Sequence, residues 1–423
     1  KAAGYGSPVH GAAAKPVSTL TLCNRADSSD IEMRLDLLIF GGGVAGLWCL
    51  DRFRRAGYIA ILLESQALAH GQTIQAQGII HGGGKYALRG VRDFTAVRAT
   101  KEMPERWRRS LAGEIKPDLR GTKVIADRCH LWLPRGSMSA RVLSWGLLPL
   151  VGKAGLLSTP PQQLPYSMWP AALRGSALAV YSLAEPVIAT GSLVEVLARR
   201  YRKWIFSYEV SDLKFSGEQV QIGAKSFQPR SMLFAAGNGN ADLMQRARIH
   251  GDFMQRRPLK MVLLRGANLP ELFGHCIVRG KTQLTVTTPT RGIWQVGGEI
   301  AEKLACQENL DEGRQISMSE IQRCLPGLDF SGVEIALYTA IRAEAKTAAQ
   351  KRPSGVHVSH VAPGIVVGWP TKLSMAPIFA EEAFALVHEE LKKPGDYGEP
   401  WANWPTPSVA RYPWEEAEWF AAR

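Results

Sequence analysis

The sequence predicts an α/β fold with a parallel sheet, and three features of the chain support this prediction. Short apolar runs typical of buried strands alternate with longer segments that have the spacing of helices. The first apolar run, residues 35–40, ends in glycines that precede a helical pattern at residues 44–56. A second apolar run, residues 59–63, follows that helix, and this order is typical of a parallel β-α-β unit.

Further elements are expected along the rest of the chain. The same patterns predict helices at residues 91–111, 192–203 and 376–392, and strands at residues 219–223, 232–236, 284–287, 293–296 and 364–368. The proline-rich stretch 158–170 is expected to be an irregular loop between domains or a lid. The apolar segment 143–157 is too short to cross a bilayer, so we expect a buried helix or a lid, with contact at a membrane interface as the alternative.

The composition excludes several classes of protein. Of the 423 residues, 46% are hydrophobic and 21% are charged, so the chain can bury sizeable cores and is not intrinsically disordered. A run of about 18 apolar residues, which a transmembrane helix needs, does not occur. The six cysteines form no CxxC pair, which argues against a zinc site and a disulfide framework. A reducing, cytoplasmic location is therefore expected.

The ends of the chain differ in composition from its body. Residues 1–32 are rich in Ala, Gly, Ser and Pro, and we expect them to form a flexible extension. Residues 396–423 form an aromatic-rich tail whose last 23 residues contain four tryptophans. We expect this tail to pack along a domain surface.

The charge of the chain is strongly positive, with a net value of +13. The excess is concentrated in residues 85–109, which could line the approach to a site or could form a solvated helix face. A basic surface favours anionic partners, such as a phosphorylated substrate, an acidic membrane surface or nucleic acid. The charge does not decide among these partners.

Residues 41–46 match the GxGxxG pattern of a dinucleotide-binding turn. The context strengthens the match, because the turn follows a buried strand and opens a helix. Gly41 permits the tight turn, Gly43 lets the backbone approach a pyrophosphate, and Gly46 allows close packing of helix against strand. The helix N-terminus at Val44 and Ala45 would face the negative charge.

The second strand ends in Glu64, about 20 residues after the glycine turn, as expected for an acidic residue that binds a ribose diol. A carboxylate at this position disfavours a 2′-phosphate, so FAD or NAD is expected rather than NADP. The combined pattern predicts a Rossmann-like domain.

Residues 71–86 are rich in glycine and polar residues and contain His81-Gly82-Gly83 near their end. A flat ring needs close approach of the backbone, and glycine allows it. This block resembles the segment beside the flavin in the D-amino-acid-oxidase and glycerol-3-phosphate-dehydrogenase superfamily. The resemblance implies that the cofactor is FAD.

Other blocks resemble the same superfamily in the same order along the chain. They are residues 184–199, 232–240, 293–302, 341–344 and 364–377. The final turn, residues 368–372, lacks the several glycines of many amino-acid oxidases, and residues 352–355 replace their Arg-Pro-Asp-Gly-like stretch. These departures, with the Lys-Tyr pair after the His-Gly block, place the resemblance closest to the glycerol-3-phosphate-dehydrogenase branch.

The resemblance implies an FAD-binding domain made of three separated segments, with a mixed-sheet α+β substrate domain interleaved between them. Residues 33–100, 175–245 and 350–395 are assigned to the FAD-binding domain. Residues 101–174 and 246–349 are assigned to the substrate domain, which also serves as a cap.

The residues expected to bind FAD lie in the glycine turn, the flavin segment and two later turns. They are Gly41, Gly43, Val44, Ala45, Gly46, Glu64, Ser65, Thr73, Gln77, Gly78, Ala236, Gly237, Gly368, Thr371 and Lys372. A helix that starts near residue 373 would direct its positive end at the flavin edge that becomes negative on reduction, and Lys372 would add a full charge. The alternative is an exposed lysine at a helix start.

His81 and Arg342 are the residues expected to carry the chemistry. His81 is the candidate base, because an alcohol must lose its proton as hydride leaves. The alternatives are a structural histidine, or one that positions or covalently anchors the flavin. Arg342 lies in the stretch that resembles the anion-binding strand of the superfamily, and a guanidinium suits a carboxylate or a phosphate. An ordinary ion pair is the alternative for Arg342.

Other candidates are weaker. Gly83 and Lys85 are expected to line the substrate site, and Arg257 is a further candidate for the anion. His275 and Cys276 are expected to be core residues. His357 and His360 have a spacing that a metal could use, but they lack a third ligand in the sequence, so no metal is expected.

Three functions remain open from the sequence. The first is an FAD-dependent dehydrogenase or oxidase acting on a small anionic alcohol, such as glycerol 3-phosphate or a 2-hydroxy acid. The second is an amino-acid or amine oxidase of the same superfamily. The third is a flavin-containing RNA-associated or non-catalytic protein, although a nucleic-acid partner is not favoured. A quinone or oxygen would accept the electrons, and family members that use quinone motivate peripheral contact with the inner face of a membrane.

Overall fold

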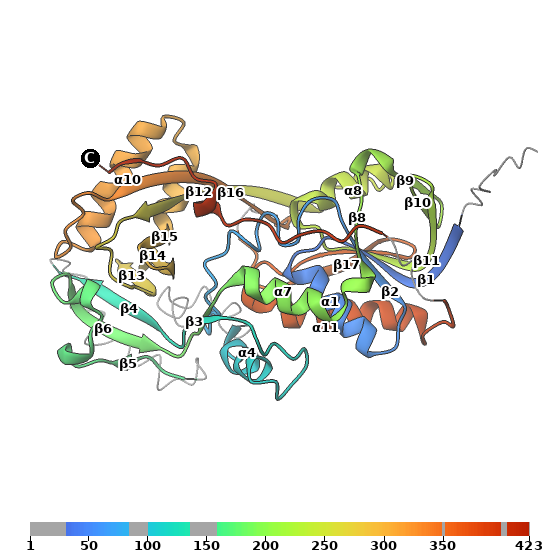
Figure 1. The fold of residues 1–423 in the computed structure, drawn as a ribbon, viewed down its shortest axis with the longest axis horizontal. Coiled ribbons are helices and arrows are strands. Elements are labelled where there is room, and N and C mark those ends of the chain that lie inside the picture. The colour runs from blue at the N-terminus through green and yellow to red at the C-terminus, as the bar shows by residue number, and fades with distance from the viewer. Residues whose placement is uncertain (1–30, 84–99, 136–158, 349–351, 399–403, 423) are drawn as a thin grey trace, which may run out of the picture.

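The computed structural model describes residues 31–83, 100–135, 159–348, 352–398 and 404–422. Two large sheets lie toward opposite ends of an elongated molecule (Figure 1). The chain passes between the two sheets several times, so each sheet is built from segments that are distant in the sequence.

The first sheet has eight strands and a parallel core. Its main path runs β17 (His357–Ala362), β18 (Ile365–Trp369), β11 (Lys225–Phe234), β1 (Ile31–Phe40), β2 (Ala60–Glu64) and β8 (Ile205–Ser207). The strands from β18 to β8 are parallel, and β17 is an antiparallel edge. The short strands β9 (Leu213–Ser216) and β10 (Gln219–Ile222) extend β11.

Helices cover this sheet because its strands are apolar on both faces. Residues 37–40 of β1 are completely buried. The covering helices include α1 (Val44–Arg55), α7 (Thr190–Arg200) and α11 (Ala376–Leu391), and α1 contacts both of the others (Figure 1). Helix α8 (Asn240–Arg246) follows β11. This arrangement is the predicted dinucleotide-binding architecture.

The second sheet has nine strands. Their order is β19 (Phe420–Ala421), β16 (Glu334–Ala345), β12 (Met254–Arg265), β15 (Ile293–Gly297), β14 (Lys281–Thr290), β13 (Gly274–Val278), β4 (Cys129–Pro134), β6 (Ala177–Leu183) and β5 (Gln162–Gln163). The sheet is mixed, because β13 and β4 are parallel while the other neighbours are antiparallel. Helix α10 (Leu310–Cys324) packs its buried side chains against one face, and α9 (Glu299–Lys303) follows β15.

A small sheet joins the two halves. It pairs β3 (Val124–Ala126) with β7 (Val187–Ile188), and an isolated bridge adds Ile79 to Val187. Helix α4 (Met103–Leu111) lies beside this region (Figure 1). None of the helices in the described part of the chain has the length and apolar content needed to cross a membrane.

The aromatic tail packs along both halves. Trp404 stacks on Phe206 and Phe227 of the first sheet, with ring centroids 4.8 and 5.4 Å apart. Farther along, β19 pairs with β16 of the second sheet. The tail is therefore integral to the fold and links its two halves.

The predicted α/β fold with an interleaved mixed-sheet unit is confirmed, but some boundaries were wrong. Strand β1 begins at Ile31, within the segment expected to be an extension, because its first residues pair with β11. The helix predicted at 91–111 is confirmed over residues 103–111, which form α4, but residues 101–102 form a turn, so α4 starts where Pro104 can occupy the first helical turn. The rest of that prediction, and the apolar segment 143–157, lie outside the described residues.

Two further differences concern residues 158–183. The stretch expected to be irregular contains the edge strand β5 and a single 3₁₀ turn, residues 166–168. The predicted domain boundary at residue 175 differs from the division made by the sheets, because β6 pairs with β4 in the second sheet. Alternation of apolar residues cannot show which of two sheets a strand joins.

Candidate active site

The turn after β1 has the geometry that a dinucleotide cofactor requires. Gly41 has a φ of +110°, and a Cβ atom on it would lie 2.5 Å from the Cα of Ala236. A Cβ atom on Gly46 would lie 1.9 Å from the carbonyl oxygen of Gly41. Both positions therefore exclude every side chain, as the pattern of glycines predicts.

The N-terminus of α1 lies at the end of the glycine turn. Its N-cap, Gly43, has no side chain to cap the first amides, and the amide of Val44 donates to Thr73 Oγ1 at 3.1 Å. The residues of this turn fit the pyrophosphate of a dinucleotide such as FAD, which would add charge complementary to the helix end.

Glu64 closes the same turn from β2. Its Oε2 accepts a hydrogen bond from the amide of Gly42 at 2.6 Å, and its Oε1 accepts one from Gln66 at 2.9 Å. Burial raises the pKa of Glu64, although these hydrogen bonds oppose the shift. The carboxylate thus fastens the glycine turn, a role that the sequence did not predict, while its contact with a ribose stays a prediction.

Two later turns lie beside the glycine turn. The amide of Ala236 donates to Asn240 Oδ1 at 2.8 Å, and Gly237 has a φ of +57°. The indole of Trp369 donates to the carbonyl of Gly237 at 3.1 Å, which fastens the final turn to the one after β11. Gly368 is tightly enclosed, because a Cβ atom there would lie 2.5 Å from the carbonyl oxygen of His357.

The final turn leads directly into a helix, as predicted. Thr371 has a φ of +64° and donates from its hydroxyl to the carbonyl of Gly355 at 2.6 Å. A 3₁₀ turn, Leu373–Met375, then precedes α11. Lys372 is buried, with 7% of its surface exposed, so the alternative of an exposed lysine is wrong. A buried cation near a helix start suits an anionic flavin edge.

The glycine-rich segment lies over one face of the second sheet. Gln77 donates from Nε2 to the carbonyls of Thr285 and Gln295 at 2.9 and 2.8 Å. Gly78 has a φ of +74°, and a Cβ atom on it would lie 2.0 Å from the carbonyl oxygen of Ile188. Gln72 Oε1 accepts from the amide of Ala343 at 3.0 Å. The segment is therefore fastened between the two sheets.

Strands β12 and β16 carry the two candidate arginines. Arg257 and Arg342 are direct neighbours in the strand register. Arg257 forms a bidentate pair with the buried carboxylate of Glu344, at 2.9 and 3.1 Å. Burial raises the pKa of Tyr338 on the same strand, and the charge of Arg342 opposes this shift. The Tyr338 hydroxyl accepts a hydrogen bond from Gln295 Nε2 at 2.6 Å, and Arg257 is paired with Glu344.

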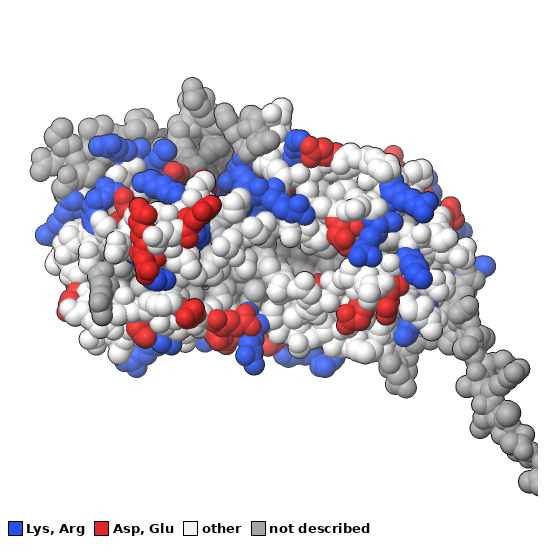
Figure 2. All heavy atoms as spheres, turned by 90° about the horizontal axis from the view of Figure 1, so that it is seen from above, with Lys and Arg blue, Asp and Glu red and all other residues white. Residues whose placement is uncertain are grey.

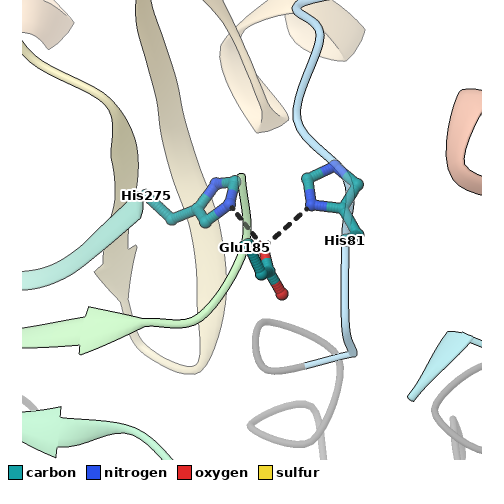
Figure 3. A group of neighbouring side chains, drawn as sticks. All are labelled: His81, Glu185 and His275. Atoms are coloured by element: carbon teal, nitrogen blue, oxygen red, sulfur yellow. Dashed lines mark hydrogen bonds and ion pairs between the residues drawn. The ribbon is translucent and has the colours of Figure 1, made fainter. Parts of the chain in front are cut away.

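His81 is part of a cluster with Glu185 and His275 (Figure 3). His81 Nδ1 lies 3.2 Å from Glu185 Oε2, and the amide of Gly82 donates to Glu185 Oε1 at 2.8 Å. His275 Nε2 lies 3.8 Å from the same Oε2 atom. The side chain of His81 is 16% exposed, whereas those of Glu185 and His275 are buried.

The electrostatics of this cluster favour an ionised carboxylate. Burial alone would raise the pKa of Glu185, but the contact with His81 and the charges of His275 and His81 outweigh burial and hold the pKa well below its ordinary value. The donor atoms of the three side chains lie within 4.8 Å of one another, a spacing that a hydrogen-bonded cluster and a cation site share. The prediction that no metal is bound stays a prediction.

The sequence did not indicate the role of two members of this cluster, His275 and Glu185. His275 was expected to be only a core residue; it is fully buried, but it faces Glu185. Glu185 was not singled out at all. A signal for it exists, since this acidic residue lies two residues after the end of the buried strand β6, in a largely apolar stretch.

The remaining predicted residues are less informative. Gly83 has a φ of +96°, and Lys85 lies outside the described residues. His357 Nε2 contacts Ser359 Oγ at 3.1 Å within β17. Figure 2 shows Lys and Arg side chains interspersed with Asp and Glu over one face of the molecule, without a continuous basic stripe on the described part of that face.

A separate cavity of about 690 Å³ lies between the flavin segment, the start of α7 and the tail. Its lining includes Gln77, Gln295, Thr190 and Tyr412, but neither His81 nor Arg342. We therefore do not assign the substrate to this cavity.

Comparison with known proteins identifies the family. A family profile described as "DAO: FAD dependent oxidoreductase" matches residues 36–368. The probable FAD-dependent oxidoreductase PA4991 of Pseudomonas aeruginosa is 34% identical over 392 residues, which are 90% of this chain and 98% of that protein. Its crystal structure matches with a TM-score of 0.76 and 31% identity, covering 91% of this chain and 98% of that one.

More distant structures share the fold alone. The L-alpha-glycerophosphate oxidase from Mycoplasma pneumoniae, with FAD bound, matches with a TM-score of 0.60 and 17% identity, over 90% of this chain and 99% of that one. Glycine oxidase from Geobacillus kaustophilus matches with a TM-score of 0.58 and 13% identity, over 86% of this chain and 97% of that one. The predicted cofactor and enzyme class are confirmed: this chain belongs to the DAO family of FAD-dependent oxidoreductases.

Proposed function

We propose that this FAD-dependent oxidoreductase oxidises a small anionic alcohol, of the 2-hydroxy-acid or glycerol-3-phosphate class, to the corresponding carbonyl compound. FAD, when bound, supplies the hydride acceptor. The protein supplies the binding, orientation and proton transfer. A chain with the residues described above can perform each of these tasks.

The observation that carries the proposal is the placement of His81. Its partly exposed imidazole lies at the end of the segment fastened over the second sheet, with one ring nitrogen directed at Glu185 (Figure 3). Oxidation of an alcohol releases a hydride from carbon and a proton from the hydroxyl oxygen, and the proton needs a base. A neutral amine needs no such base before hydride leaves, so His81 favours an alcohol.

Arg342 is the proposed anchor of the substrate anion. The proposal assigns the anion to Arg342 because residues 341–344 resemble the anion-binding strand of the superfamily, and its strand neighbour Arg257 pairs with Glu344. A single guanidinium suits a carboxylate, which accepts two parallel hydrogen bonds. This feature favours a 2-hydroxy acid within the proposed class.

The experiment that tests the proposal is an anaerobic absorbance titration of the holoenzyme. Glycerol 3-phosphate, 2-hydroxy acids and amino acids are added in turn, and loss of the visible flavin absorbance reports reduction. We expect an alcohol of the anionic class to reduce the flavin, and His81→Gln to slow that reduction at least about 100-fold while FAD remains bound. Arg342→Met should weaken substrate binding far more than it slows the bound complex.

The second candidate is an amino-acid or amine oxidase, and the assignment of a single arginine to the anion is the feature that favours it. Reduction of the flavin by amino acids alone would replace our proposal with this one. If no compound reduces the flavin, an RNA-associated or non-catalytic role gains support, and the proposal fails.

The electron acceptor and the location belong to the same proposal. We propose a cytoplasmic enzyme, with peripheral contact at the inner face of a membrane if a quinone accepts the electrons. Reoxidation of the reduced holoenzyme by oxygen, compared with a soluble quinone, distinguishes an oxidase from a dehydrogenase.

A further inference from the structure

We propose that Glu185, supported by His275, is a positioning residue that holds the proton of neutral His81 on Nδ1 and so presents Nε2 as the unprotonated base. The inference rests on the proposed function, because it specifies how His81 acts in that site. It adds two residues that the sequence did not assign to the chemistry.

The imidazole of His81 is oriented by its contact with Glu185. Its Nδ1 atom is directed at Glu185, and its Nε2 atom points away from that carboxylate (Figure 3). An ionised carboxylate only accepts hydrogen bonds, so the ring nitrogen that faces it must carry the proton. The other nitrogen of the neutral ring then carries no proton, and it is the atom that we propose accepts the proton of a substrate hydroxyl.

The position of Glu185 is fixed by the backbone around it. The amide of Gly82 donates to its Oε1, so both carboxylate oxygens have partners from the His81 segment. The preceding carbonyl of Ala184 accepts from Arg108, and the following carbonyl of Pro186 accepts from the amide of Ile80 at 2.9 Å. Glu185 therefore cannot move away from His81 without breaking these contacts.

His275 lies on the far side of the carboxylate. Its Nδ1 atom lies 3.0 Å from the Thr285 hydroxyl on the neighbouring strand β14. If that hydroxyl donates, the His275 proton is on Nε2, which faces Glu185 Oε2 at 3.8 Å. A buried carboxylate is costly without such partners, so His275 stabilises the ionised form that His81 needs.

One charged group should influence the pKa of His81 more than the others. Among the described residues, the charged groups around His81 are Glu185, His275 and Arg108, which reaches the carbonyl next to Glu185. Glu185 carries the negative charge nearest to His81. Its removal should therefore lower the pKa of His81, because a neighbouring anion favours the imidazolium.

The decisive experiment is a histidine titration that needs no substrate. The holoenzyme is labelled with ¹⁵N-histidine, and the His81 signals are identified by their loss in His81→Gln. We expect the Nδ1-protonated tautomer in the native enzyme, and a His81 pKa about 1 pH unit lower in Glu185→Gln. Asp51→Asn is the matched control, because it converts a buried carboxylate to an amide at the α1–α7 contact; it should leave His81 unchanged.

Flavin reduction provides the second measurement. Glu185→Gln should slow reduction about 10-fold without weakening substrate binding, and the pH at which the rate rises should move downward with the His81 pKa. In the His81→Gln background, Glu185→Gln should have no further effect, because the positioning residue acts through His81.

The outcomes separate the inference from the proposed function. The inference would be overturned if Glu185→Gln left the tautomer and the pKa of His81 unchanged. It would also be overturned if Glu185→Gln slowed flavin reduction as much in the His81→Gln background as in the native enzyme. Elemental analysis that finds one divalent metal per holoenzyme, lost in Glu185→Gln, would also overturn it. If His81→Gln reduces its flavin at the native rate, the proposed role of His81 fails, whereas the ¹⁵N titration still tests the Glu185 contact.

Discussion

The glycine turn and the histidine cluster are held together in opposite ways. The turn is formed by residues 41–46, and its shape depends on backbone atoms and on the absence of side chains. The cluster joins His81, Glu185 and His275 from three separated segments, and it depends on charge and hydrogen bonding. A local backbone device can be recognised from consecutive residues, whereas a cluster of distant side chains requires the fold. The two regions should therefore fail differently when altered.

The largest effect is expected from Gly46→Ala in the turn. The added Cβ atom would lie 1.9 Å from the carbonyl of Gly41, and backbone atoms cannot move aside without opening the turn. We expect the purified variant to retain less than about a tenth of the FAD of the native enzyme. The ratio of the absorbance at 450 nm to that at 280 nm measures this loss directly, and it should fall by about an order of magnitude.

The control is Gly398→Ala, because a Cβ atom at that exposed position meets no other atom within 4 Å. It should retain FAD like the native enzyme. A yellow Gly46→Ala protein with full FAD content would show that the steric account of the turn is wrong.

A second comparison tests how much burial strengthens a charge pair. Arg257 pairs with the buried Glu344, and Arg265 pairs with the exposed Glu334 in a similar bidentate geometry. Arg257→Met leaves a buried carboxylate uncompensated and should lower the free energy of unfolding by about 3 kcal/mol. Arg265→Met should lower it by less than about 1 kcal/mol. Urea denaturation of both variants measures the difference, and equal losses would contradict this explanation.

The same contrast explains what the sequence could predict. The β1–turn–α1 unit and the acidic end of β2 are local patterns, and both were predicted from spacing alone. The final turn and the burial of Lys372 depend on how β18 lies beside β11, which spacing does not show. The partnership of Glu185 with His275 depends on β13 and β6 lying on either side of β4 in the second sheet. Such long-range pairings are not encoded in any short window of the sequence.

The turn and the cluster each contain a carboxylate, and the stability that each contributes should depend on pH in a different way. The pKa of Glu64 in the turn is raised chiefly by burial, whereas the pKa of Glu185 in the cluster is lowered because the two histidines outweigh burial. A raised carboxyl pKa means that the folded state binds the proton more tightly, so this contribution to stability falls as pH rises above the unfolded pKa. A lowered pKa has the opposite sign: the contribution is present above the unfolded pKa and is lost as pH falls.

We therefore expect opposite trends for the two amide variants of the apoprotein, in two different pH ranges. As the pH rises toward the ordinary carboxyl pKa of 4.5, the stability difference between the native protein and Glu185→Gln should grow; as it rises above that value, the difference for Glu64→Gln should shrink. Urea midpoints measured across both ranges report the two trends, and apoprotein avoids any linkage to FAD binding. Parallel trends for the two variants would contradict the assigned electrostatics.

The smallest effect is expected where a side chain assists the turn. Thr73 Oγ1 accepts the amide of Val44 at 3.1 Å, as an N-cap side chain would, because Gly43 has no side chain to do so. Thr73→Val keeps the shape but removes the acceptor, and it should lower the free energy of unfolding by about 1 kcal/mol. Thr73→Ser keeps the hydroxyl and should be close to native. Urea denaturation of the two variants tests this, and a loss for Thr73→Val as large as that for Arg257→Met would mean that the turn depends on this one hydrogen bond as much as the second sheet depends on the Arg257–Glu344 pair.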